Sequence, residues 1–293
     1  MSDTTIAIVL ALGAGMSYSI AAILQQRVAS EQPPELSLSP RLIVELVKRP
    51  LWLLGIVFDV GAYVMEATAL GFGSVVIVGP LLVSGLLFAI PLATWGTGQR
   101  VTRREMVPAI MVAGGLAVFV GIGDPTGSSS EASLLGWIVA GAVIATMSGA
   151  ALLAGRRTSV PPHRRALFYG LATGTLYGLT AVLTKATVDL LGDDVFGLLV
   201  HWQLYALLIV SVGGLILNQS AFQAGHVAAS LPVIAVANPV LSASLGIVLF
   251  GERFGAEGVL AWGTTTLAII AMVVGTIRLA SSPLVAHDPV LEV

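Results

Sequence analysis

The sequence predicts an all-α polytopic membrane protein with nine transmembrane helices, arranged as a 4+1+4 inverted repeat. Apolar residues make up 56% of the 293 and charged residues only 10%, against roughly a quarter in soluble domains. Runs of about 20 apolar residues, each long enough to cross a hydrocarbon core, recur along nearly the whole chain. The two halves of the chain also resemble each other, which predicts the repeat.

The apolar runs set the boundaries of the spans. The first, in "MSDTTIAIVLALGAGMSYSI", could be read as a signal peptide. It lacks a basic n-region and carries Asp3, so we expect a membrane helix. The nine spans are expected at residues 5–26, 51–71, 74–96, 105–123, 132–154, 166–189, 196–220, 227–250 and 257–279.

Two segments are expected outside the hydrocarbon core. After a Pro-Pro loop signal, "PRLIVELVKRP" at 40–50 places its charged residues on one helical face, which favours a short interfacial helix over an ordinary cytoplasmic loop. The tail at 280–293 is polar and contains proline, so we expect a disordered cytoplasmic segment.

Basic residues give the orientation. Of the 14 Lys and Arg residues, 12 fall on one side of the nine-span arrangement, Arg253 falls on the other, and Lys185 lies within a span. Cytoplasmic loops of membrane proteins carry the excess of Lys and Arg. We therefore expect an integral protein of the plasma (inner) membrane, with its N-terminus outside and its C-terminus in the cytoplasm.

The repeat is visible as two alignments. "ALGFGSVVIVGPLLV" at 69–83 matches "AFQAGHVAASLPVIA" at 221–235, an offset of 152, and "LGAGMSYSIAAILQQ" at 12–26 matches "LATGTLYGLTAVLTK" at 171–185. Because the shift is five helices, an odd number, the second repeat is inverted. We expect a first repeat at 1–124, a linking fifth helix at 125–158, a second repeat at 159–279 and the tail at 280–293.

Inverted repeats are typical of secondary transporters, which bind substrate between the two halves. Prolines near or within the spans would free backbone carbonyls and kink helices that face a cavity, although simple packing kinks are an alternative. These prolines are Pro80, Pro91, Pro232 and Pro239.

The segments "GMSYSIAAILQQRVAS", "FGSVVIVGPLLVSGLLFAIPL" and "YGLTAVLTKATVDLLG" resemble the drug/metabolite transporter superfamily. In its layout the chain is most similar to the NIPA-type magnesium transporter branch. The resemblance implies a secondary transporter fold in which helices of both repeats line a central cavity. The helix-2 acid of the magnesium branch corresponds to Tyr63 here, with Glu66 nearby, so magnesium as the substrate does not follow.

Two acids lie in the second span, "GIVFDVGAYVMEATALG". Asp59, Tyr63 and Glu66 are expected to share one helical face. A midplane aspartate costs about 3 kcal/mol on insertion scales, which makes Asp59 the first candidate for binding a cation or proton. A protonated, hydrogen-bonded structural acid is the alternative. If a metal binds, Asp59 and Glu66 are its candidate ligands.

Two polar pairs are candidate gates. Glu66 and Lys185 reach similar heights in the outer third of the membrane, while their repeat counterparts, Asn218 and Gln26, lie in the inner third. We expect a charged outer gate and a neutral inner gate. Alternatively, Lys185 snorkels to the interface. The tyrosines that could bind a ligand in the cavity, unless they serve only packing, are Tyr18, Tyr63 and Tyr177.

Other classes of function find little support. The chain has no cysteine, which excludes disulfides and thiolate sites, and it contains no P-loop, HExxH or nucleophile elbow. We expect no enzyme activity, no cofactor and no nucleic-acid partner. The expected partners are a small solute or ion and the lipid bilayer, and a homodimer is left open. A non-transporting membrane scaffold and a neutral-metabolite exporter are the alternatives.

Overall fold

The computed structural model of the chain is all-helical in the residues it describes, which are 3–72, 81–82, 85–94, 101–122, 132–193, 197–251 and 258–280. Its α-helices are α1 (Asp3–Ser30), α2 (Pro40–Val47), α3 (Pro50–Phe72), α5 (Gly85–Thr94), α6 (Arg103–Ile122), α7 (Leu134–Gly155), α8 (Pro162–Asp193), α9 (Trp202–Ala224), α10 (Val227–Phe250) and α11 (Gly258–Ala280). Two short 3-10 helices, Pro34–Leu36 and Gly197–Val200, lie in connections.

Six helices of the described residues are long and apolar enough to cross a membrane. They are α1, α7, α8, α9, α10 and α11. Their outward faces carry large apolar side chains, such as Leu135 on α7, Ile209 on α9 and Leu260 on α11, which are 69%, 72% and 84% exposed. Lipid rather than water suits such a surface. The chain is an integral membrane protein.

The helix boundaries follow local sequence signals. Helix α1 continues past the predicted end at residue 26 to Ser30, because Gln25, Gln26 and Arg27 are good helix formers and the Pro33–Pro34 pair follows only later. The predicted start of the seventh span at 196 is wrong: a 3-10 turn comes first, and α9 begins at Trp202. Of the predicted third span, 74–96, only 81–82 and α5 lie within the described residues.

The expected surface helix is present as α2. Ser39 accepts a hydrogen bond from the backbone N–H of Arg41, and Pro40 occupies the first helical position, which starts the helix efficiently. Its Leu42 and Leu46 are buried, whereas Glu45 and Lys48 form an exposed ion pair. Helix α2 is thus amphipathic, as its sequence predicts.

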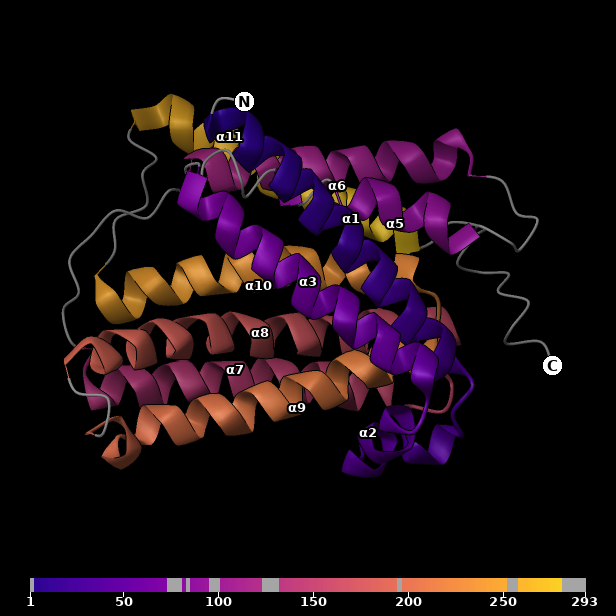
Figure 1. Cartoon of the computed structure of the whole chain (residues 1–293), viewed down its shortest axis with the longest axis horizontal. Helices are drawn as coiled ribbons and strands as arrows, with labels where there is room; N and C mark the ends of the chain where they lie inside the picture. The colour runs from indigo at the N-terminus through magenta and orange to yellow at the C-terminus, as the bar shows by residue number, and fades with distance from the viewer. Residues whose placement is uncertain are drawn as a thin grey trace.

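The helices pack in two sets that meet at the centre. Helix α1 packs against α3 and α5, and α8 packs against α7, α9 and α10, while α6 pairs with α11. Figure 1 shows α7, α8, α9 and α10 running in nearly the same direction, with α1 and α3 crossing in front of them at an angle. Contacts of α1 with α9 and of α5 with α10 join the two sets, and the cavity described next lies between them.

Candidate functional site

A cavity of about 510 Å³ lies between the helices of the two halves. It is lined from the first half by α1, α3, α5 and α6, and from the second by α8, α9 and α10. The wall is mostly apolar, with Leu82, Leu116, Phe222, Leu231 and Ile234 among its side chains. A mostly apolar pocket with a few polar groups is the usual form of a small-molecule site.

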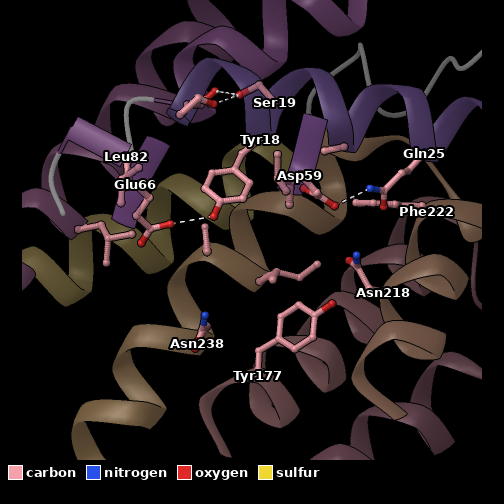
Figure 2. Close-up of a pocket in the computed structure, with 17 residues that line it drawn as sticks. Tyr18, Ser19, Gln25, Asp59, Glu66, Leu82, Tyr177, Asn218, Phe222 and Asn238 are labelled. Atoms are coloured by element: carbon pink, nitrogen blue, oxygen red, sulfur yellow. Dashed lines mark hydrogen bonds between the residues drawn. The ribbon is translucent and has the colours of Figure 1, made fainter. Parts of the chain in front are cut away.

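Both predicted acids of α3 reach this cavity. Asp59 and Glu66 are among its lining residues, and Figure 2 shows their carboxylates on the same side of the space, separated by Tyr18. Tyr63 is not among them. Its side chain is 66% exposed on the outer surface, so the prediction that it shares the acids' face is corrected. Tyr63 lies about 60° around the helix from Glu66, which is enough to turn it outward.

Tyr18 contacts one of these acids directly. Its hydroxyl donates a hydrogen bond to Glu66 Oε2 at 2.7 Å, which joins α1 to α3 across the cavity wall. This bond holds the Glu66 side chain in place. In the described residues, the other oxygen of Glu66 accepts no hydrogen bond, which leaves it available to a ligand.

Asp59 ends a chain of hydrogen bonds that crosses three helices. Trp52 Nε1 of α3 donates to Gln219 Oε1 of α9 at 3.0 Å, and Gln219 Nε2 donates to Gln25 Oε1 of α1 at 2.7 Å. Gln25 Nε2 then donates to Asp59 Oδ2 at 2.6 Å. The three side chains that lead to Asp59 are almost fully buried, at 4%, 0% and 2% exposure. We call them, together with Asp59, the amide relay.

The direction of this relay is set by its first member. An indole N–H can only donate, so Gln219 must present its oxygen to Trp52 and its NH₂ group to Gln25. Gln25 must in turn present its oxygen to Gln219 and its NH₂ to Asp59. The carboxylate therefore receives a donor on Oδ2, and its Oδ1 has no partner in the described residues.

The predicted inner pair, Gln26 with Asn218, is wrong by one residue on each helix. The structure joins Gln25 to Gln219, whereas Gln26 donates weakly to the Gly225 carbonyl at 3.5 Å and Asn218 lines the cavity. Adjacent helical positions point about 100° apart, so only the relative rotation of α1 and α9 decides which amides meet. The signal in the sequence for a polar contact here is the pair of adjacent glutamines, Gln25 and Gln26, in an otherwise apolar helix.

Three further polar side chains face the cavity. Tyr177 of α8, Asn218 of α9 and Asn238 of α10 line it and make no hydrogen bond among the described residues. Figure 2 shows Asn238 on the Glu66 side, with Asn218 and the Tyr177 hydroxyl toward the Asp59 side. Tyr177 and Asn218 were predicted from the sequence, whereas Asn238 was not. The signal for Asn238 is its place in an apolar span, directly before Pro239.

The outer pair is not tested by the structure. Lys185 lies on α8, but its side chain is outside what the structure describes, and the described partner of Glu66 is Tyr18. A pair of Glu66 with Lys185 therefore stays a prediction.

Of the four prolines predicted to kink helices, three lie within helices that the structure describes. Pro232 and Pro239 lie within α10, the helix that contributes four cavity residues, and Pro91 lies inside α5. Because Pro239 has no N–H, the carbonyl of Ala235, a cavity residue, loses its helical partner. Pro80 lies outside the described residues.

Among the described residues, no three His, Cys, Asp or Glu side chains gather closely enough to hold a metal ion. Asp59 and Glu66, the predicted candidates, lie two helical turns apart, about 10 Å along α3. Since Mg²⁺ and Ca²⁺ require six or more oxygens close around the ion, the described protein groups alone do not form a metal cage.

The chain is similar to "Uncharacterized protein Cgl0250/cg0304" of Corynebacterium glutamicum. The two are 32% identical over 282 residues, which cover 96% of each chain. No protein-family model matches the chain, and no solved structure does. The similarity therefore covers the helices that build the cavity, and the relative's name assigns it no activity.

Proposed function

We propose that this chain, which belongs to the same family as the corynebacterial protein, is a secondary transporter. It moves a small cationic or proton-coupled solute across the membrane by alternating access, with Asp59 as the central acid. The observation that carries the proposal is the cavity between the two halves, which two carboxylates enter from one helix. Acids inside a membrane protein are costly unless they serve a site.

The lining makes the cavity suitable for a cation. No Lys, Arg or His occurs among its described lining residues, so the charge of Asp59 and Glu66 is not neutralised by a basic side chain there. The hydrogen-bond donors to them, Gln25 and Tyr18, are neutral. A positively charged ligand would supply the missing charge, which a neutral metabolite would not. This favours a cation over the neutral-metabolite alternative.

Matching contacts in the two halves support the 4+1+4 repeat. A Cβ on Gly15 of α1 would lie 2.9 Å from the Leu82 carbonyl and 3.2 Å from the Gly85 nitrogen. Its predicted equivalent, Gly174 of α8, would meet Ala237 at 2.6 Å and Ile234 at 3.3 Å. Ile234 and Ala237 are Leu82 and Gly85 shifted by 152, the offset found in the sequence.

The pairing of α6 with α11 agrees with this symmetry. In two repeats related by a two-fold axis, one pair of equivalent helices can pack against each other on that axis. Gly115 of α6 lies against Ala268 of α11, since its Cβ would be 2.8 Å from the Ala268 carbonyl. Their separation of 153 is within one residue of the repeat offset. We extend the proposal to nine spans, with α7 as the linker and α3, α5 and α6 as spans.

The amide relay supplies an inner gate. Gln25 belongs to the first half and Gln219 to the second, so their hydrogen bond closes the space between the halves at this level. Opening toward that side requires the bond to break. Because Gln25 also donates to Asp59, a cation that binds the carboxylate competes for the same group. Glu66 and Lys185 remain the proposed outer gate.

The proposed location is the inner membrane, with the N-terminus outside and the C-terminus in the cytoplasm. The second candidate function is a non-transporting membrane scaffold, for which the apolar outer faces of α7 and α11 would suffice. A scaffold has no use for a relay of buried amides that ends at a cavity carboxylate.

Flux measurements in proteoliposomes test the proposal. Wild-type protein, Asp59→Asn and the surface control Glu45→Gln are reconstituted, and uptake of Mg²⁺, choline and 1,6-diaminohexane is followed. We expect at least one cation to enter wild-type and Glu45→Gln vesicles faster than Asp59→Asn vesicles. Equal rates for every cation in all three preparations would contradict transport through this cavity.

A further inference from the structure

The two cavity carboxylates are separated along one helix. Asp59 and Glu66 lie seven positions apart on α3, which corresponds to about 10 Å along its axis. Each has one oxygen engaged by a neutral donor, from Gln25 at 2.6 Å and from Tyr18 at 2.7 Å. The donors fix both carboxylates while their second oxygens stay without partners in the described residues. The cavity thus has two anionic points at a set spacing.

The rest of the cavity wall is mostly apolar. Leu116 of α6 and Ile234 of α10 line it and offer no hydrogen bond from their side chains, and Tyr18, which lies between the two carboxylates, has its hydroxyl bonded to Glu66. A volume of about 510 Å³ greatly exceeds a bare ion and falls within the range of about 300–1,000 Å³ that organic ligands occupy. Such a wall suits a hydrocarbon chain rather than water or a hydrated metal.

We propose that the cavity binds an elongated organic dication, a linear diammonium, with one ammonium group at each carboxylate. The inference deepens the proposed function and rests on it for the view that the cavity is a substrate site. An ammonium group has three donors. One reaches the free oxygen of Asp59 or Glu66, and the others require nearby neutral acceptors.

Neutral acceptors are present at each end. Figure 2 shows Asn238 on the Glu66 side of the space. On the Asp59 side it shows Asn218 and the hydroxyl of Tyr177. The side chains of Asn218, Asn238 and Tyr177 line the cavity and have no hydrogen-bond partner among the described residues. Each end therefore combines a carboxylate with a neutral oxygen, the set that an ammonium group recognises.

Charge balance favours a dication over a single charge. A monoamine would neutralise one carboxylate and leave the other uncompensated in an apolar space, which is the unfavourable half of a buried ion pair. A diammonium neutralises both. A divalent metal carries enough charge, but Asp59 and Glu66 start from positions about 10 Å apart along α3 and are held by separate donors, so one small ion does not contact both.

Thermal unfolding of the purified full chain in detergent tests this inference. A ligand that binds only the folded state raises the melting temperature. The probes are 1,6-diaminohexane, the shorter 1,3-diaminopropane, the monoamine 1-aminohexane and Mg²⁺. We expect 1,6-diaminohexane to give the largest rise, and 1,3-diaminopropane to act like the monoamine because its nitrogens are too close to reach both carboxylates.

Variants then separate the two ends. Asp59→Asn and Glu66→Gln should each reduce the rise for 1,6-diaminohexane to that of the monoamine, while Glu45→Gln, altered in an exposed ion pair on α2, keeps it. A monoamine that matches the diamine on wild-type protein would overturn the inference, as would a larger rise with Mg²⁺. Both comparisons use wild-type protein, so they hold even if a variant fails to fold.

The binding test and the flux test can fail independently of each other. If 1,6-diaminohexane binds as expected but no cation moves faster through wild-type than through Asp59→Asn vesicles, the site is a dication site and the transporter proposal fails. If another cation is transported and no diamine raises the melting temperature above the monoamine, transport stands and the diammonium inference fails.

Discussion

At the scale of single residues, Trp52 acts on the cavity although its side chain is not among the lining residues. Its donor-only indole orients two glutamine amides in succession and so delivers an N–H to Asp59. A residue at the start of α3 thereby acts on a carboxylate about two turns further along the same helix, through two other helices. Buried networks of this kind are stable only when every member is satisfied.

Replacing Trp52 by Phe should therefore destabilise the protein beyond the loss of ring area. Gln219 Oε1 would remain buried without its donor, at a cost of about 1–3 kcal/mol. Both amides could then reverse, so that Gln25 presents an oxygen to Asp59. We expect a lower melting temperature in detergent and slower flux. Trp262→Phe, at a position that is 55% exposed, is the control. Equal effects of the two substitutions would refute the relay.

Asp59→Asn tests the central acid. Asparagine has the same shape and can still accept a hydrogen bond from Gln25, so the relay and the fold should persist while the charge is lost. We expect normal membrane insertion and expression, but cation uptake at the level of protein-free vesicles. Wild-type flux in this variant would make Asp59 a structural acid.

Periodicity and repeat matching identified much of the site. Asp59, Glu66, Tyr18, Tyr177 and Asn218 all line the cavity, because acids and aromatics in apolar spans are few and repeat alignment selects among them. What the sequence did not reveal is the rotation of one helix against another.

That rotation explains the residues that were placed wrongly or missed. It turned Tyr63 outward and made Gln25 and Gln219, rather than their neighbours, the inter-half pair. The role of Trp52 was missed for the same reason.

At the scale of helices, close backbone approach sets the cavity walls. Helix α1 contacts α5 through Gly15 and Gly85, and α8 contacts α10 through Gly174 and Ala237. In the described residues, the sequence predicted most helix ends to within a few residues, since apolar runs and prolines are local signals. Which helices touch depends on small residues whose partners are far away in the chain, and composition does not identify them.

Gly15→Ala and Gly174→Ala should have similar effects, because the proposed repeat makes their contacts equivalent. The added methyl group would lie 2.9 Å from the Leu82 carbonyl at Gly15 and 2.6 Å from the Ala237 Cβ at Gly174, which forces the neighbouring segment to move, at a cost of about 1–3 kcal/mol. Gly61→Ala is the matched control, since nothing lies within 4 Å of its Cβ and alanine favours a helix. Unfolding in detergent measures all three. A drop for Gly61→Ala as large as for the others would contradict the contacts.

At the scale of the whole molecule, topology decides between an even and an odd number of spans. The basic residues predict that a reporter fused before Met1 is external and one fused after Val293 is cytoplasmic. The two reporters should therefore give opposite signals in intact cells. If both lie on the same side, the nine-span arrangement is wrong and the second half is not an inverted copy of the first.

Alternating access through the cavity is the central claim, and the absence of cysteine from the chain allows a direct measurement. Asn238→Cys places a single thiol in the cavity, and Val143→Cys, on the exposed apolar face of α7, is the control. Both are exposed to a membrane-impermeant maleimide in right-side-out and inside-out vesicles. We predict that Asn238→Cys reacts in both orientations and Val143→Cys in neither. Reaction of Asn238→Cys from one side only, or from none, would contradict the transporter account.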